Sequence, residues 1–453
     1  MTCDSNKYST TAALSVIVAN MIGVGVFSSL GFQVMSIEDG GIPDGFAILI
    51  IWLLGGIVAL CGAFSYAEVA TTLKRSGGEY VYLSKLYHPC LGFTSGWISL
   101  IVGFSGAIAS AGLAIGKYSA PAMGIDVEGG WYVFGFLLSF QKIIAIVVIL
   151  ILSLIHLRGV QTGGILQTCL TLFKMAIILV FCLAPFFATS VNNEGLSVFL
   201  PSDKSSSIIF SFSFASALVW VMYAYSGWNA ATYIAENIVN PNKTLPRVLV
   251  LGTIIVTVAY VALNAAFMYI SSFEELAYNE DIGNIVALKL FGVNFGSAFS
   301  GVFSLALLST MSAMIIAGPR VTEQVGEDYA LFRILTIKSK GGTPTYAILL
   351  QALVAIVLVI FSTFQELIQT LGIILSFFSL LTVIGVFIIR KKFSSEDIPI
   401  KTWGYPITPV IFIVACSWMI VSFVINDPIK ILYSIFSIIL GMILYFFIKK
   451  NNL

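Results

Sequence analysis

The chain has 453 residues, of which 58% are hydrophobic and only 10% are charged. Soluble domains carry about 25% charged residues, so this composition excludes an ordinary water-soluble protein. The formal net charge is +1, from 23 Lys and Arg against 22 Asp and Glu, which excludes the broad basic surface that nucleic-acid binding needs. The sequence therefore predicts a helical protein that crosses a lipid bilayer many times.

The sequence lacks the residue groups that membrane enzymes and metalloproteins use. It contains two histidines, His88 and His156, and six cysteines. None of them stands at the spacing of a metal site, and no Ser–His–Asp set or H-E-x-x-H stretch is present. We therefore expect no enzymatic activity, no metal and no cofactor.

Twelve apolar segments are long enough to cross a bilayer, which takes about 20 residues of helix. They predict an all-α polytopic membrane protein with 12 transmembrane helices in one transporter-sized domain. The segments group into five spans within 11–188, five within 208–389 and two accessory spans within 407–448. In chain order, the predicted spans are 11–36, 44–71, 91–118, 140–157, 164–188, 208–236, 246–270, 294–319, 344–363, 366–389, 407–425 and 429–448.

The distribution of positive charge predicts the orientation in the membrane. If the N-terminus is cytoplasmic, 17 of the 23 Lys and Arg fall on the inner side, five fall on the outer side, and Lys174 lies within a span. An excess of Lys and Arg marks cytoplasmic connections. We therefore expect a multi-pass protein of the cell inner (plasma) membrane with both termini in the cytoplasm.

Two glycines, Gly23 and Gly25, interrupt the middle of the first span. Glycine weakens a helix, and freed backbone groups inside a bilayer are tolerated only where they face protein or a water-filled cavity. A break here would direct backbone N–H groups at a site near the bilayer midplane, which favours a bound anion such as a carboxylate. The alternative is that the glycines only allow close helix packing.

Small and polar residues interrupt the sixth span in a similar way. Ser226, Gly227 and Asn229 interrupt an apolar run at mid-depth, beside Tyr223 and Trp228. The sixth span opens the second group of five, so interrupted helices occur at corresponding places in both groups. This pattern is typical of transporters built from two inverted repeats, with the substrate site at the broken helices.

Four separated stretches together resemble the amino acid–polyamine–organocation (APC) superfamily of transporters, and most closely bacterial L-type amino acid transporter-like permeases. The first stretch is similar to the family's Gly-x-Gly-x-Phe signature, the second to its connection between helices two and three, the third to its sixth helix, and the fourth to the loop that follows. The four stretches are Met21–Phe27, Arg75–Trp97, Tyr223–Glu236 and Asn240–Arg247.

The resemblance implies a LeuT-type fold of five plus five inverted helices plus two, with helices 1 and 6 broken. It also implies alternating-access transport of an amino acid. Backbone groups from Gly23 to Gly25 would hold the substrate carboxylate, although Val24 stands where L-type relatives often have Ser. The carbonyls of Met21 and Ile22, together with Tyr223 and Ser226, would bind the α-ammonium. Trp228 would be an aromatic gate or wall of the pocket, and Asn229 would be a polar contact.

Lys174 lies inside the fifth span, about ten residues from its outer end. A charged residue at mid-membrane costs about 2.5–3.5 kcal/mol on insertion scales and is a functional candidate by default. The alternative is a lysine that reaches the inner interface from a tilted helix. In many sodium-independent relatives a lysine matches this position and takes the place of sodium. The resemblance therefore implies a sodium-site surrogate near Gly23 and transport without sodium.

Three other groups of charges carry structural expectations. We expect Glu68 to pair with cytoplasmic cations near Lys74, with a proton-relay role as the alternative. Glu236 should pair with Arg247 or with a lysine of the 74–85 connection. The mixed charges of 320–343 predict an amphipathic helix at the cytoplasmic interface.

The sequence is compatible with several substrate classes and functions. No acid stands at the positions matched to the family's pocket, which favours a neutral amino acid carried by an exchanger or a proton symporter. A carrier of cationic amino acids or polyamines is the alternative, and a membrane sensor that binds an amino acid without moving it is the candidate from another class. The outer connection after the third span has no cysteine, so we expect no disulfide-linked heavy chain.

Overall fold

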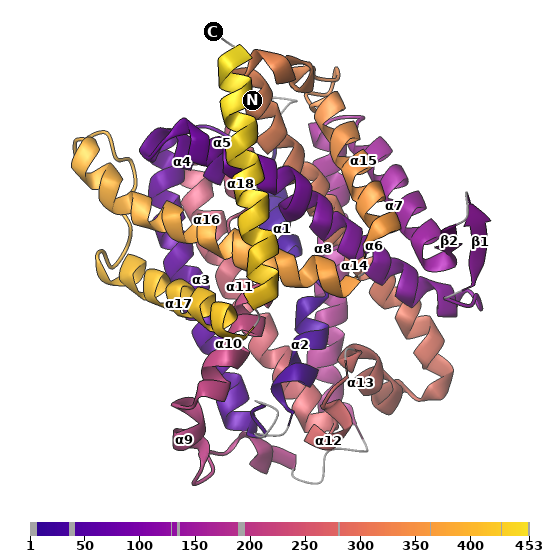
Figure 1. Ribbon diagram of the computed structural model, residues 1–453. Coiled ribbons are helices and arrows are strands. Elements are labelled where there is room, and N and C mark those ends of the chain that lie inside the picture. Colours follow the sequence, from indigo (N-terminus) through magenta and orange to yellow (C-terminus); the bar gives the residue numbers. More distant parts are fainter. Residues whose placement is uncertain are drawn as a thin grey trace.

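A computed structural model describes residues 7–35, 41–127, 129–133, 136–188, 195–279, 281–362, 364–426 and 428–451. The protein is nearly all helical (Figure 1). Within these residues, eight helices are long and apolar enough to cross a membrane, and five shorter apolar helices accompany them. The architecture is that of a polytopic membrane protein.

The first predicted span is two helices rather than one, and the third contains a π-helical turn, η1. The elements of the first half are α1 (Thr10–Met21), α2 (Gly25–Gln33), α3 (Gly45–Leu73), α4 (Glu79–Leu86), α5 (Pro89–Ile98), η1 (Ser99–Phe104), α6 (Ser105–Ala122), β1 (Gly130–Val133), β2 (Phe136–Ser139), α7 (Phe140–His156) and α8 (Val160–Leu183).

The sixth predicted span is also divided, and its second part is the 3₁₀ helix η4 rather than an α-helix. The remaining elements are η2 (Ala184–Phe187), η3 (Gly195–Phe199), α9 (Ser205–Ile209), α10 (Phe212–Ala224), η4 (Ala230–Asn237), α11 (Pro241–Ile270), α12 (Phe273–Leu276), α13 (Ile282–Phe291), α14 (Val293–Asp328), η5 (Ala330–Thr336), α15 (Thr345–Phe361), α16 (Phe364–Lys392), α17 (Ile407–Asn426) and α18 (Pro428–Asn451).

The two broken segments form the centre of the bundle. Helix α1 packs against α8, α11 and α14. In an 18-residue stretch of α1 and α2, 83% of the residues are buried, against 28% in comparable stretches of α7 and α8. Because lipid accepts apolar side chains, α7 and α8 can expose their outer faces, whereas the first span lies inside protein.

Side-chain caps help to set where several helices begin. The Ser9 hydroxyl accepts a hydrogen bond from the Ala12 N–H at 3.1 Å and caps α1. The Asp44 carboxylate accepts from the Ala47 N–H at 2.8 Å and caps α3. Its second oxygen accepts from the hydroxyl of Ser205 at 2.7 Å, which connects α3 to the start of α9. Such caps satisfy amides that the helix itself leaves without acceptors.

Both ends of the chain lie at the same end of the bundle, opposite α9 and α12 (Figure 1). There the N-terminal segment is fixed beside the end of η4. The Tyr8 N–H donates to the Asn237 carbonyl at 2.6 Å, and the Val239 N–H donates to the Tyr8 carbonyl at 3.2 Å. Termini on one side require an even number of crossings.

The connection between α6 and α7 contains a two-stranded antiparallel hairpin that the sequence analysis did not predict. Gly130 pairs with Ser139 and Val133 pairs with Phe136. The hairpin projects from the helices at the edge of the molecule (Figure 1).

The prediction of an amphipathic interfacial helix over 320–343 is wrong. Helix α14 continues to Asp328, and Arg320 is only 2% exposed. Arg320 donates to the Glu323 carboxylate at 2.8 Å, and Lys338 approaches the other oxygen of Glu323 at 2.7 Å. Arg320 and Glu323 thus face one another inside the protein, whereas the other charged residues of this segment, Glu327, Asp328, Arg333, Lys338 and Lys340, are exposed.

Candidate substrate-binding cavity

The first helix break comprises residues 22–24. Helix α1 ends at Met21, and the Ile22 N–H donates to the Val18 carbonyl at 3.0 Å as the last turn closes. Helix α2 then begins at Gly25. The first amides of a helix have no acceptor within that helix, so the N–H groups of Val24 and Gly25 can donate to a ligand.

The second break comprises residues 225–229, between α10 and η4. Gly227 has φ +94°, a conformation that L side chains rarely adopt, and it packs on the first helix. A Cβ at Gly227 would lie 2.9 Å from the Cβ of Asn20, and one at Gly25 would lie 3.2 Å from the Cα of Ala224. The two breaks therefore lie directly against each other, and glycine makes the approach possible.

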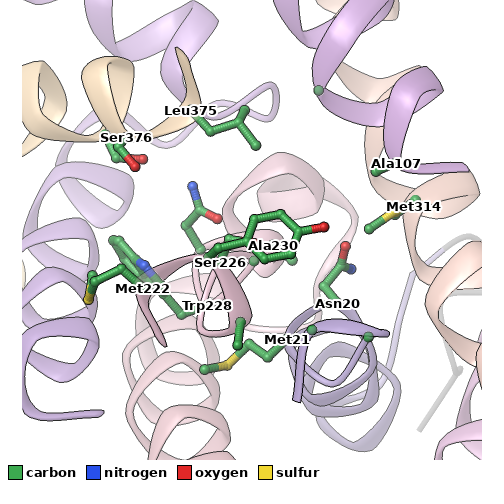
Figure 2. Close-up of a pocket in the computed structure, with 18 of the residues that line it drawn as sticks. Asn20, Met21, Ala107, Met222, Ser226, Trp228, Ala230, Met314, Leu375 and Ser376 are labelled. Carbon is green, nitrogen blue, oxygen red and sulfur yellow. The ribbon is translucent and has the colours of Figure 1, made fainter. Parts of the chain in front are cut away.

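A cavity of about 380 Å³ lies at the two breaks. Figure 2 shows Asn20 and Met21 of α1 on one side of it, Leu375 and Ser376 of α16 across from them, and Met314 of α14 on a third side. Eight of the nine predicted substrate contacts line this cavity. They are Met21, Gly23, Val24, Gly25, Tyr223, Ser226, Trp228 and Asn229.

The ninth predicted contact, Ile22, does not line the cavity. Its side chain is fully buried, and its carbonyl oxygen accepts hydrogen bonds from Lys174 and, at 3.0 Å, from the Thr310 hydroxyl. A carbonyl oxygen has two lone pairs, so both are occupied. The expectation that this carbonyl binds the α-ammonium therefore conflicts with the structure.

The Met21 carbonyl oxygen accepts a hydrogen bond from the Gly23 N–H at 2.9 Å. The Tyr260 hydroxyl lies 2.6 Å from this oxygen and 2.8 Å from the Ala224 carbonyl oxygen. One side chain thus connects the last residue of α1 to the last residue of α10. Because it holds the ends of both broken helices together, Tyr260 is a positioning residue that the sequence analysis did not single out.

Lys174 lies behind the first break, and 2% of its surface is exposed. Its ammonium donates to the Ile22 carbonyl, to the Thr310 hydroxyl at 2.6 Å and to the Ala19 carbonyl at 3.5 Å. Three neutral oxygens from α1 and α14 thus surround the ammonium. A small cation would meet the same kind of oxygen cluster.

Trp228 forms part of the cavity wall and is 5% exposed. Its ring packs edge-on against Tyr66 of α3, with centroids 4.7 Å apart, and against Phe412 of α17, with centroids 5.6 Å apart. The indole therefore joins the second break to two neighbouring helices.

A charged cavity residue, Glu79, was not predicted from the sequence. Glu79 lines the cavity, is 4% exposed, and accepts a hydrogen bond from the Asn229 amide at 2.6 Å. Gly77 (φ +100°) and Gly78 (φ +54°) turn the chain so that α4 begins with Glu79 beside the second break. The statement that the pocket contains no acid is therefore wrong, and the pair of glycines before an acid was the available signal.

The expected partners of the other two acids differ from those observed. Glu68 pairs with Arg390 of α16, not with cations near Lys74, because α16 packs against α3. Glu236 meets the 74–85 connection through its main chain, since its N–H donates to the Ser76 hydroxyl at 2.9 Å. Within the described ranges, no three His, Cys, Asp or Glu side chains lie close enough to hold a metal ion.

Comparison with known proteins identifies the family. The model of the amino acid permease family matches residues 8–448, nearly the whole chain. The chain belongs to the amino acid permease family. It is therefore a membrane transporter and not an enzyme, and its apolar helices make it a multi-pass membrane protein.

Several curated transporters are similar over most of their length. The serine/threonine exchanger SteT of Bacillus subtilis is 27% identical over 97% of this chain and 96% of its own. The mouse b(0,+)-type amino acid transporter 1 is 27% identical over 96% of this chain and 86% of its own. The mouse large neutral amino acids transporter small subunit 2 is 26% identical over 96% of this chain and 79% of its own.

Proposed function

We propose that the protein is a sodium-independent secondary transporter that moves amino acids across the plasma membrane by alternating access. The observation that carries this proposal is the cavity at the two facing helix breaks, where backbone donors and acceptors are free of their own helices. Exchange is favoured over proton symport because a relative that matches the whole chain is named an exchanger.

We further propose a LeuT-type arrangement of 12 transmembrane helices. Residues 11–188 and 208–389 would form the two inverted five-helix repeats, and 407–448 would form two accessory helices. Helices occupy every predicted span, the break falls in the first helix of each repeat, and both termini lie at one end. The excess of Lys and Arg on the connections at that end supports a cytoplasmic position for it.

In the proposed substrate complex the amides of Val24 and Gly25, with the turn at Gly23, hold the carboxylate. The α-ammonium donates to the Met21 carbonyl oxygen, which gains an acceptor position when the Tyr260 hydroxyl donates to the Ala224 carbonyl instead. The second broken helix supplies polar contacts from Tyr223, Ser226 and Asn229, and Trp228 forms the aromatic wall.

Lys174 is proposed as the surrogate for a sodium ion. Its ammonium holds α1 to α14 through the Ile22 carbonyl and Thr310. A side-chain ammonium at this place would take over the role of a transported cation, which supports transport without sodium.

Neutral amino acids are proposed as substrates because relatives are named for serine, threonine and large neutral amino acids. Although one relative is named a small subunit, residues 123–139 contain no cysteine, so no disulfide-linked heavy chain is proposed. The alternative function, transport of cationic amino acids or polyamines, is supported by the presence of Glu79 in the cavity. A sensor that does not transport would bind the same ligands without moving them.

Uptake of labelled serine into proteoliposomes that contain the purified protein tests the proposal. We expect uptake that depends on unlabelled serine inside the vesicles and is unchanged when sodium is replaced by choline. Uptake into empty vesicles that requires a proton gradient would indicate symport instead. Binding of serine without uptake above that of protein-free vesicles would favour the sensor, and a sodium requirement would refute the role of Lys174.

A further inference from the structure

Glu79 has half of its hydrogen-bonding capacity unused. Its Oε1 accepts from the Tyr66 hydroxyl at 2.7 Å and from the Asn229 amide at 2.6 Å. Its Oε2 is buried and has no hydrogen-bond partner among the described residues. A buried carboxylate oxygen without a partner is costly, so such an atom is a candidate for binding something that the protein alone does not supply.

The cavity offers this carboxylate no compensating charge. Among the described residues that line the cavity, Glu79 is the only charged side chain. Lys174 is outside the lining, because its ammonium is directed to carbonyls behind the first break. The groups around Glu79 are the hydroxyls of Tyr66 and Tyr233 and the amide of Asn229, all of them neutral. A positively charged group in the cavity would therefore pair with Oε2.

The position of Glu79 along the second break indicates which part of a substrate it meets. Gly25 approaches Ala224, where the unwound segment starts, whereas Glu79 contacts Asn229, where it ends. The carboxylate and ammonium on the α-carbon of an amino acid both belong at the first location. Only the far end of a long substrate side chain would extend to the second location, beside Glu79 and Asn229.

We infer that the cavity accepts amino acids with a long cationic side chain, such as lysine, and that Glu79 Oε2 binds the side-chain cation. The inference rests on the proposed function, since it assumes that the α-carboxylate lies at Gly25. It makes Glu79 a specificity-determining residue of the same cavity.

Glu79→Gln is the sharpest variant. The amide oxygen of Gln can accept from both Tyr66 and Asn229, while an N–H₂ donor replaces the acceptor that faces the cavity. Norleucine is the matched ligand, because it has the lysine chain without the ammonium. Cadaverine is the second matched ligand, because it has the chain and an ammonium without the carboxylate. Glu396→Gln, at an exposed acid outside the cavity, is the control variant.

Binding of each ligand to the full-length protein in detergent is measured by its protection against thermal unfolding, alongside inhibition of serine exchange in proteoliposomes. We expect Glu79→Gln to weaken lysine binding roughly tenfold to hundredfold, which corresponds to the loss of one charge-assisted hydrogen bond. The affinity of Glu79→Gln for norleucine should stay within about twofold of the wild-type value, a factor that corresponds to about 0.4 kcal/mol. Cadaverine should bind at least about tenfold more weakly than lysine.

Three results would overturn the inference. The first is that the wild-type protein binds norleucine but not lysine. This test does not depend on whether a variant folds. Glu79→Gln would weaken lysine and norleucine equally, which would assign Glu79 to the α-ammonium. Cadaverine would bind as tightly as lysine, which would remove the role of the carboxylate. If lysine binds in a Glu79-dependent way but no amino acid is transported, the proposed transport fails and the site assignment stands.

Discussion

Arg390 in the last turn of α16 donates hydrogen bonds to both carboxylate oxygens of Glu68 in α3, at 3.0 and 2.9 Å. The Glu68 side chain is completely buried, whereas 24% of the Arg390 side chain is exposed. The N–H of Thr402 donates to the same carboxylate at 2.6 Å. This pair fixes the end of α16 and the following loop onto α3.

We expect Arg390→Met to destabilise the protein by about 3–5 kcal/mol, because it leaves Glu68 charged, buried and without its partner. Thermal unfolding in detergent measures the loss. Lys391→Met, at the exposed neighbouring residue, is the control and should unfold near the wild-type temperature. Equal melting temperatures for the two variants would show that Glu68 does not depend on Arg390.

A second ion pair should contribute much less to stability. Arg75 donates to Asp328 at 2.8 Å and to Glu327 at 3.2 Å, but these side chains are 22%, 35% and 41% exposed. Solvent screens such pairs, so Arg75→Met should cost less than about 1 kcal/mol. The difference from wild type should shrink further in about 1 M salt. A loss as large as that of Arg390→Met would contradict this expectation.

Loss of the intramembrane ammonium should affect transport more than expression. Lys174→Ala removes the donor shared by the Ile22 carbonyl and Thr310, so the first break loses its connection to α8 and keeps only the direct hydrogen bond between Thr310 and the Ile22 carbonyl at this place. We expect serine exchange to fall at least about tenfold, measured as initial rates normalised to the protein in the vesicles. Lys289→Ala, which removes a lysine paired with Glu275 outside the cavity, should exchange normally. Normal exchange by Lys174→Ala would make the lysine structural only.

The two glycines at the breaks should differ in their tolerance of a methyl group. Gly227 has φ +94°, and its Cβ would lie 2.9 Å from Asn20, so Gly227→Ala should cost about 1–3 kcal/mol from backbone strain and separate the two breaks. At Gly23 the nearest atom to a Cβ is 3.8 Å away on Thr310, so Gly23→Ala should leave the stability of the protein nearly unchanged. Melting temperatures and serine binding of the two variants provide the comparison, and equal losses would argue against a tight contact at Gly227.

The helix breaks and the intramembrane lysine could be predicted from local sequence, because the bilayer restricts which residues a membrane-spanning segment tolerates. Gly23 and Gly25 in one apolar run, and Ser226 and Gly227 in another, stand out because lipid does not tolerate freed backbone groups. The structure ends α1 and α10 beside these residues and places Lys174 behind the first break. A lone intramembrane cation could be recognised for the same reason, although its contacts with Thr310 could not.

Long-range pairing was not predictable in the same way. Glu68 and Arg390 are 322 residues apart, and local sequence does not indicate that α16 packs on α3. Glu79 was missed because it belongs to a connection between spans that turns back to the second break. Arg320 and Glu323 resemble the polar face of a surface helix in sequence, and only the packing of α14 shows that they neutralise each other inside the protein.

The π-helical turn η1, between α5 and α6, determines which side chains of α6 face the cavity. A π turn takes up one residue more than an α turn, so the side chains after Phe104 are shifted in phase relative to those before Ser99. Phe104 at the end of the turn and Ala107 and Ala111 beyond it line the cavity. Deleting one residue within the turn would restore a regular helix and rotate these side chains by about 100°. The shape of the binding site thus depends on the number of residues in this turn as well as on their identity.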